Sequence, residues 1–328
     1  MAVMSFEAFM DEALYGVGGF YTRADGGFAG RRGDFLTSPE VGPLFGAVIA
    51  RYLDAEWRRL GEPDDFVVVD VGAGPGTLAR SVTAARPACL VRGRYIAVEE
   101  SAAQRKRHPD SVGSVAELPD QVQHGVIIAN ELLDNLPFRL AVFDDGWREA
   151  YVDTADPNQV IEQLSARFDP VPGVLPERSN IGGRAPLVDR AAGWVSDARE
   201  RLLHGSLVAI DYGVATTAEL ASRPWREWLR TYCGNERGGH YLVSPGSQDI
   251  TTDIPLDQLP EPDSVRSQAQ FLQLHGLDEL VEEGKRTWSE QASAPGLEAM
   301  KMRSRISEAE ALLDPNGLGG FFVAEYRA

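Results

Sequence analysis

The run VVVDVGAGPGTLARSV, residues 67–82, constrains the fold of this chain more than any other segment. It opens as a short β-branched stretch with almost no alternation of apolar and polar residues, which is typical of a strand buried on both faces. Gly72, Gly74 and Gly76 follow, and then an apolar helical pattern. Glycines let the backbone turn sharply and approach a ligand closely, and the helix offers free N–H groups. The run therefore predicts a strand, a ligand-binding loop and a helix.

Short apolar strands and helical patterns also alternate along the rest of the chain, which predicts an open α/β sheet. The segment 139–152 predicts a hairpin around residues 144–146, and residues 222–263 show little periodicity and predict an inserted loop region. We expect Gly205 to end the helix before it in the C′ position. The predicted strands are 66–71, 95–98, 125–129, 207–210 and 320–326, and the predicted helices are 4–15, 43–59, 187–203 and 267–275.

The spacing of the glycines separates two kinds of nucleotide site. The dinucleotide fingerprint is GxGxxG, whereas this chain has GxGxG with Asp70 two residues before the first glycine, which suits a ligand without a pyrophosphate. Glu99 ends the next predicted strand, where a carboxylate can hydrogen-bond the hydroxyls of a ribose, and the adjacent Glu100 is an alternative. Glu117 is a candidate beside an adenine. A tight turn without a ligand, and a solvated acid at a strand end, are the simpler readings of the same residues.

Composition excludes several classes of partner and site. The 328 residues include 32 Lys and Arg against 49 Asp and Glu, a net charge of −17, which argues against nucleic acid or an anionic membrane surface and suits a cationic partner. Cys89 and Cys233 cannot form a disulfide framework, and no two histidines have metal-ligand spacing, so we expect no metal site. The N-terminus does not resemble a signal peptide, and no stretch approaches the ~20 apolar residues of a membrane span. We therefore expect a cytoplasmic protein.

The motif Asp-x-Gly-x-Gly-x-Gly with a strand-end Glu resembles the class I S-adenosylmethionine-dependent methyltransferases. Six further blocks narrow the resemblance to the MidA-type family, whose mitochondrial member helps to assemble respiratory complex I by dimethylating an arginine on a subunit. The blocks follow the family's order over nearly the whole chain. They are SFEAFMDEALYGVGGFY (5–21), GDFLTSPEVGPLFG (33–46), ANELLDNLP (129–137), AIDYG (209–213), SQDITTDI (247–254) and GLGGFFV (317–323).

This resemblance implies a Rossmann-like methyltransferase sheet with helices on both faces. It implies an N-terminal helix and lid over residues 1–43, and an S-adenosylmethionine-binding domain over residues 44–328. Within that domain we expect inserted substrate segments at about 138–185 and 214–265. The GDF-T-x-PE block, which is Gly33, Asp34, Phe35, Thr37, Pro39 and Glu40 here, is expected to lie over the cofactor and to close the pocket.

The resemblance also assigns site residues. It implies that S-adenosyl-L-methionine binds to Asp70, Gly72, Gly74, Gly76, Glu99, Thr37, Glu117 and Asn130. It implies catalytic roles for Glu131, Asp134, Asn130 and Glu40. The block that holds Asn130, Glu131 and Asp134 follows a predicted strand, and ligands bind at the carboxyl ends of strands in open α/β sheets. The alternative for Glu131 and Asp134 is that they cap a helix N-terminus, where acids complement the dipole.

The expected activity is methyl transfer from S-adenosyl-L-methionine to an arginine of an unidentified protein. Guanidinium has a pKa above ~12 and no free lone pair while protonated, so flanking carboxylates would have to localise its charge. A methyltransferase for a small metabolite, and an assembly factor that binds the cofactor without turnover, are the alternatives. A homodimer is possible.

One stretch departs from the family pattern. The family usually shows an Arg-x-Tyr and a His-rich connector before its QD-x-T block, and the nearest equivalents here are Arg230, Tyr232, His240, Asp249 and Thr251. His240 is a conceivable general base. Because this stretch is expected to contact the acceptor, its departure leaves the arginine substrate less secure than the cofactor.

Overall fold

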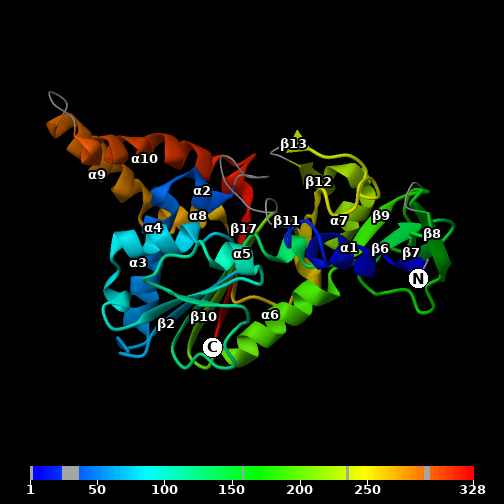
Figure 1. Cartoon of the computed structure of the whole chain (residues 1–328), viewed down its shortest axis with the longest axis horizontal. Helices are drawn as coiled ribbons and strands as arrows, with labels where there is room; N and C mark the ends of the chain where they lie inside the picture. Colours follow the sequence, from blue (N-terminus) through cyan, green and yellow to red (C-terminus); the bar gives the residue numbers. More distant parts are fainter. Residues whose placement is uncertain (1–2, 24–36, 157–158, 234–235, 292–295) are drawn as a thin grey trace.

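A computed structural model describes residues 3–23, 37–156, 159–233, 236–291 and 296–328 (Figure 1). Gly33, Asp34 and Phe35 of the expected pocket cover lie outside the described residues. A seven-stranded sheet forms the centre of the molecule, in the order β16-β17-β10-β5-β2-β3-β4. Its strands are β2 (Val67–Val71), β3 (Arg94–Val98), β4 (Gly113–Val115), β5 (Gly125–Asn130), β10 (Gly205–Asp211), β16 (Ser264–Ser267) and β17 (Phe322–Arg327).

The middle of this sheet is parallel and fully buried, as the apolar runs predict. Every residue of β2 and of β10 is buried, and β17 runs antiparallel to both β10 and β16. Strand β2 pairs with β3 on one side and with β5 on the other, so the strand order reverses there. The carboxyl ends of β2 and β5 at this reversal are where open α/β sheets bind ligands.

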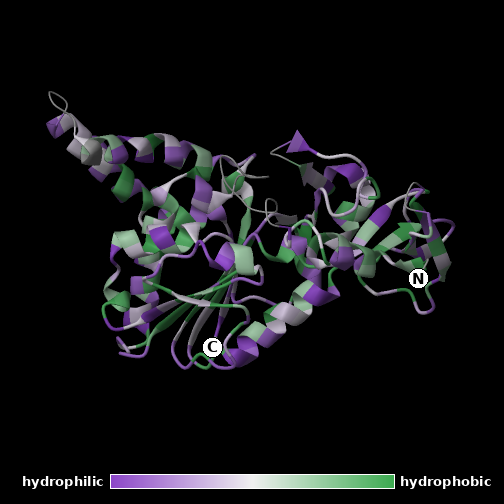
Figure 2. Cartoon of the chain, in the orientation of Figure 1, coloured by the Kyte–Doolittle hydropathy of each residue, from purple (hydrophilic) through white to green (hydrophobic). Residues whose placement is uncertain are grey.

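Helices cover both faces of the sheet because alternate strand residues point to opposite sides. Val67 and Val69 pack in one apolar cluster with α6 (Asp189–Arg201), whereas Val68 packs in a second cluster with α3 (Pro43–Arg59) and α4 (Thr77–Ala85). Colouring by hydropathy shows hydrophobic strands between these helices (Figure 2). The further helices are α5 (Ala102–Arg105), α7 (Thr217–Ser222) and α8 (Gln268–Leu274), and the short 3-10 helices are η1 (Ala88–Leu90), η2 (Leu133–Asn135), η3 (Trp225–Glu227), η4 (Leu256–Gln258) and η5 (Leu318–Gly320).

The N-terminal segment joins the first insertion rather than standing apart from it. Strand β1 (Val3–Ser5) pairs antiparallel with β7 (Trp147–Asp153), beside β6 (Arg139–Phe143). The sheet is completed by β8 (Ile161–Arg167) and β9 (Arg184–Leu187). Helix α1 (Phe6–Tyr15) buries the apolar face that its periodicity predicts. The ring of Phe6 packs against that of Phe138, with centroids 5.3 Å apart. The hairpin expected at residues 144–146 is present, with Phe143 opposite Trp147.

The second insertion is more ordered than its sequence predicts. A three-stranded sheet, β13-β12-β14, lies within the expected loop region, formed by β12 (Leu229–Cys233), β13 (Glu236–Arg237) and β14 (Asp249–Thr252). A second small sheet pairs β11 (Gly213–Val214) with β15 (Ile254–Pro255). These strands escape prediction because they are short and bury polar side chains such as Thr231 and Thr251.

Two long helices, in addition to the short α2, α5 and α7, have no counterpart among the predicted elements. Helices α9 (Leu277–Glu290) and α10 (Leu297–Leu313) pack against each other and extend from the body of the molecule (Figure 1). The short α2 (Ser38–Val41) lies between α10 and the sheet region, in contact with α3 and α4. No described helix has the length and apolar character needed to cross a membrane.

The expected role of Gly205 as a helix cap is wrong. Helix α6 ends at Arg201, and Gly205 is the first residue of β10. Its φ is +146°, and a Cβ at this position would lie 1.8 Å from the carbonyl oxygen of Gly125. The glycine is needed because two parallel strands begin in close backbone contact.

Candidate active site

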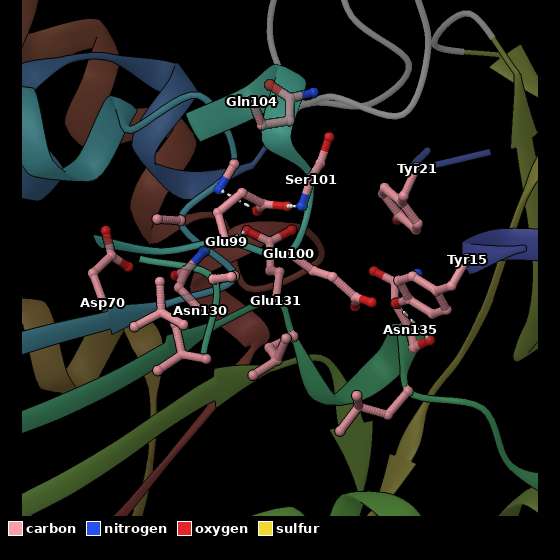
Figure 3. A pocket seen from close by; sticks show the side chains of 18 of the residues that line it. Tyr15, Tyr21, Asp70, Glu99, Glu100, Ser101, Gln104, Asn130, Glu131 and Asn135 are labelled. Carbon is pink, nitrogen blue, oxygen red and sulfur yellow. Dashed lines mark hydrogen bonds between the residues drawn. The ribbon is translucent and has the colours of Figure 1, made fainter. Parts of the chain in front are cut away.

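A cavity of about 870 Å³ lies at the carboxyl ends of β2 and β5. The glycine loop after β2 forms one wall, and α1 with the N-terminal part of α6 forms the opposite one. Figure 3 shows Glu99, Asn130 and Glu131 on one side of this cavity and Tyr15 and Tyr21 facing them. Sequence-predicted residues that line it are Thr37, Glu40, Asp70, Gly72, Gly74, Glu99, Asn130 and Glu131.

The glycine loop has the backbone geometry that only glycine adopts readily. Gly72, Gly74 and Gly76 have φ values of +70°, +52° and +79°. A Cβ on Gly74 would point into open space, with no atom of the described chain within 4 Å. Gly76 does not line the cavity; it precedes α4 and packs against His108, whose Cδ2 would lie 3.1 Å from an added Cβ. A side chain on Gly74 would therefore fill ligand space, whereas Gly76 serves the turn.

Glu99 lies at the cavity with its carboxylate held in place by two backbone amides. Its Oε2 accepts a hydrogen bond of 2.9 Å from the Gly74 N–H, and its Oε1 accepts one of 2.8 Å from the Ser101 N–H. Burial raises the pKa of Glu99 above its ordinary value, against the lowering effect of these two amides. Each carboxylate oxygen keeps a free lone pair, so the group can still accept hydrogen bonds from ribose hydroxyls.

Asp70 lies in β2, two residues before the first glycine of the loop, and lines the cavity. It is buried, and the Tyr95 hydroxyl donates a hydrogen bond of 2.9 Å to its Oδ2. Burial raises the pKa of Asp70 to about 7 despite that hydrogen bond.

Asn130 and Glu131 end β5 and turn into the cavity. Glu131 has a φ of +53°, a left-handed conformation that non-glycine residues rarely adopt and that often marks a functional site. Its Oε1 accepts hydrogen bonds from the Ser38 N–H at 3.1 Å and from Asn130 Nδ2 at 3.2 Å. Burial raises the pKa of Glu131 to about 8, and the negative charge of Asp134 adds to this. The Asn130 Oδ1 is buried and has no hydrogen-bond partner within the described chain.

Asp134 lies behind the cavity rather than on its wall. It is 3% exposed, and its Oδ2 accepts hydrogen bonds from the Tyr212 hydroxyl and from Thr251 Oγ1, the latter at 2.5 Å. Burial raises the pKa of its carboxyl group, while these two hydroxyls lower it. Asp134 therefore contacts hydroxyl groups of the surrounding chain rather than the cavity, and its catalytic role stays a prediction.

Asp211 holds the same loop from β10, and sequence reasoning assigned it no role. Its Oδ2 accepts hydrogen bonds from the N–H groups of Leu133 and Asp134, at 2.9 and 3.2 Å. These are the first N–H groups of η2, so Asp211 caps this helix. Glu131 does not cap η2: its carboxylate accepts the N–H of Ser38, the first residue of α2, whereas Asp134 lies in the first turn of η2. Burial, together with the charge of Asp134, raises the pKa of Asp211 well above its ordinary value.

The remaining predicted residues differ in their placement. Glu40, on α2, accepts a hydrogen bond of 2.5 Å from Thr77 Oγ1 and so ties α2 to the first residue of α4. Thr37 is buried at the start of α2 and lines the cavity. Glu117 is exposed and does not line the cavity, although its neighbours Ala116 and Leu118 do.

The wall opposite Glu131 is built by residues to which no role was assigned. The rings of Tyr15 and Tyr21 stack with centroids 5.5 Å apart and an interplanar angle of 18°. The Tyr15 hydroxyl donates to the Asn135 carbonyl at 3.2 Å, and the Tyr21 hydroxyl donates to Asp249 Oδ1 at 3.0 Å. Burial raises the pKa of Asp249 to about 7. The block 5–21 contains both tyrosines and was the available signal, but nothing local in it indicates their partners.

The stretch that departs from the family pattern, residues 230–251, has a buried part and an outer part. Arg230 forms an ion pair of 2.7 Å with Asp253 and lies over the ring of Tyr212, 4.7 Å from its centroid. His240 instead packs on Tyr241, with ring centroids 4.2 Å apart, and does not line the cavity. Burial, and the positive charge of Arg184, lower the pKa of His240. Its placement does not suit a general base in this cavity.

The residues present fit an adenosine-type ligand. A buried amide oxygen on Asn130 lacks a donor, the loop at Gly74 leaves open space, and Glu99 offers acceptors for ribose hydroxyls. Trp194 of α6 adds an aromatic wall near Leu118. The described residues contain no group of three or more side chains suited to a metal ion.

Comparisons with known proteins identify the family of this chain. Residues 48–274 match a family described as "Putative S-adenosyl-L-methionine-dependent methyltransferase". The chain is 27% identical over 279 residues to the mitochondrial protein arginine methyltransferase NDUFAF7 homolog of Drosophila melanogaster, covering 72% of this chain and 61% of that protein. It is 24% identical over 282 residues to the human mitochondrial protein arginine methyltransferase NDUFAF7, covering 74% and 61%. The matches thus span about three fifths of the length of these curated relatives.

A solved structure shows the same architecture. A Burkholderia thailandensis protein whose crystal structure holds S-adenosyl-homocysteine superposes with a TM-score of 0.81 at 25% identity, covering 100% of this chain and 88% of that chain. The match to the family model covers more than half of the chain, and the cavity described above lies within the same fold. This chain belongs to the family of S-adenosyl-L-methionine-dependent methyltransferases.

Proposed function

We propose that this chain transfers methyl groups from S-adenosyl-L-methionine to an arginine side chain of a protein. The acidic lining of the cavity is the observation that carries the proposal. Its described lining has seven acidic residues and a single basic one, Arg190, which is already paired with Glu7 and Asp11 at 2.5 and 2.8 Å. Such a lining favours a cationic acceptor. The names of the curated relatives support arginine as that cation.

Glu131 is the acid best placed to receive the guanidinium group. With a pKa of about 8, its buried carboxyl group holds a proton at neutral pH. A cation beside a carboxylate favours the ionised form, so an entering guanidinium group would lower this pKa and release the proton. The acceptor then meets a carboxylate that Ser38 and Asn130 already orient. Such an ion pair would hold the charge on one side of the guanidinium group and turn another nitrogen towards the methyl group.

The stacked tyrosines complete this acceptor site. Tyr15 and Tyr21 face Glu131 across the cavity (Figure 3), and the planar guanidinium group stacks well on aromatic rings. The bound cofactor supplies an activated methyl group on a sulfonium sulfur. What the chain contributes is alignment of the acceptor nitrogen and exclusion of water, which are the main demands of such a transfer.

Amino-acid analysis after transfer of a labelled methyl group tests this proposal. The protein is incubated with labelled S-adenosyl-L-methionine and a cell lysate, and the labelled protein is then hydrolysed. We expect the label in methylated arginine. Label in the small-molecule fraction would instead indicate a metabolite methyltransferase, and binding of S-adenosylhomocysteine without any transfer would indicate an assembly factor. Either of these results contradicts the proposal.

A further inference from the structure

A second, smaller cavity lies against an adjacent face of α1. This groove has a volume of about 300 Å³ and runs between the loop 17–19 and the loop 245–246. Phe9 and Ala13 of α1 form its buried floor, at 3% and 4% exposure, and Val160 borders it. The side chain of Val17 at its rim is fully exposed. The groove thus has an apolar floor and an exposed apolar residue at its rim, beside the polar side chains of Glu12 and Thr154.

Specific contacts hold the two loops in place. Arg23 Nη1 donates a hydrogen bond of 3.3 Å to the carbonyl oxygen of Gly246. Gly246 has a φ of +82°, and a Cβ there would lie 3.2 Å from the carbonyl oxygen of Gly18. The loops therefore pack backbone against backbone. The groove is a shaped feature of the surface rather than a gap between loose segments.

Glu12 connects the groove to the active-site cavity. It lines both of them, from the last turn of α1. It is exposed, and within the described chain no hydrogen bond or ion pair engages its carboxylate. The end of α1 adds the partial negative charge of its carbonyl groups at Gly16, which also lines the cavity. The part of α1 between the two hollows is therefore negatively charged.

We propose that this groove binds an apolar side chain of the acceptor protein close in sequence to the methylated arginine, with Glu12 pairing with a cationic group of the same segment. The inference rests on the proposed function, because it takes the acceptor to be an extended protein segment. Three observations favour this occupant. The groove is large enough for one or two side chains but not for a helix or a domain, it shares the lining residue Glu12 with the active-site cavity, and Glu12 is an acidic residue.

Direct binding of synthetic peptides tests the proposal without requiring turnover. The probes are fluorescent Gly-Ser peptides with one central arginine. In each peptide one other position carries either leucine or serine, and this position is varied along the series. The dissociation constant of each peptide is measured in the presence of S-adenosylhomocysteine. We expect one leucine position to tighten binding by about tenfold over serine, the gain from burying one apolar side chain. Val17→Asp should remove this gain. The matched control Val91→Asp, at a residue that is 82% exposed and lines neither cavity, should retain it.

A second variant tests the charge of Glu12. Glu12→Gln should weaken binding of peptides with a lysine added beside the arginine, and it should reduce the salt dependence of that binding. Equal binding of leucine and serine peptides, or equal effects of Val17→Asp and Val91→Asp, would overturn the proposal. Binding that depends on Val17 without methylation of any arginine would keep the groove and contradict the proposed acceptor. Arginine methylation that does not depend on the apolar residue of the peptide would keep the proposed acceptor and contradict the proposed role of the groove.

Discussion

The backbone N–H of Ser38 donates a hydrogen bond of 3.1 Å to Oε1 of Glu131, which lies 93 positions further along the chain. Ser38 opens α2, and its hydroxyl donates a bond of 2.9 Å to Gln268 at the start of α8. The carboxyl group in the cavity is therefore aimed by two elements outside its own strand. A group held in this way needs little reorganisation when an acceptor arrives, which is how preorganised electrostatic sites act.

Gly74→Val should abolish cofactor binding while leaving the protein folded. The side chain would enter the open space that the loop leaves for its ligand, and φ at this position is +52°. Isothermal titration with S-adenosylhomocysteine measures the effect. In thermal unfolding, S-adenosylhomocysteine at one hundred times its dissociation constant should stabilise the wild-type protein by ~2.7 kcal/mol, and NAD should not stabilise it. Stabilisation by NAD but not by S-adenosylmethionine or S-adenosylhomocysteine would contradict the assignment of the glycine loop to this cofactor.

Asp211→Asn should reduce turnover more than it reduces cofactor affinity. Asp211 binds the N–H groups of Leu133 and Asp134 and so fixes the loop that carries Glu131. An amide in its place offers one acceptor oxygen and turns an NH₂ group towards N–H donors, at a cost of about 1–3 kcal/mol in stability. Asp65→Asn, at an exposed carboxylate that pairs with His124, is the control and should change neither quantity. Equal turnover in Asp211→Asn and Asp65→Asn would show that Asp211 does not position the catalytic loop.

Stability should fall as the pH rises from about 5 to 8. Burial raises the pKa of Asp70 and of Asp249 to about 7 and that of Glu131 to about 8, while in the unfolded chain these groups ionise near their ordinary values. In this pH range the folded state thus holds more protons than the unfolded state, so the free energy of unfolding decreases with pH. Urea unfolding measures it. Asp249→Asn should flatten the decline relative to the wild type, and an unchanged slope would show that Asp249 is already ionised at pH 5.

Local sequence patterns predicted the parts of the fold that depend on neighbouring residues. The glycine loop and the buried strands around it follow from spacing within 67–82, and Glu99 follows from its place at a strand end. The hairpin α9–α10 was not predicted: its helices pack chiefly on each other, and although α9 has a clear apolar stripe, that of α10 is weak. The strands β12 and β14 were missed for a related reason, since they are held by buried polar contacts.

The candidate site was predicted in outline but not in its connections. Spacing placed Glu131 at the cavity, whereas it also suggested a direct role for Asp134, which Tyr212 and Thr251 hold behind the wall. Tyr21 and Asp249 illustrate the reason: their hydrogen bond joins residues 228 positions apart. Such a pair depends on how the N-terminal segment and the second insertion meet, and no local pattern contains that information.

Methyl transfer by Glu131→Gln at saturating cofactor tests the central claim most directly. Glutamine keeps the shape of the protonated side chain and can still accept the Ser38 N–H, so melting temperature and S-adenosylhomocysteine affinity should remain close to those of the wild type. Without an ionisable carboxyl group the acceptor loses its counter-charge, and turnover should fall on the order of 10²-fold or more. Full turnover in Glu131→Gln would contradict the claim, as would a loss of cofactor affinity in step with turnover, which would place Glu131 in the cofactor site instead.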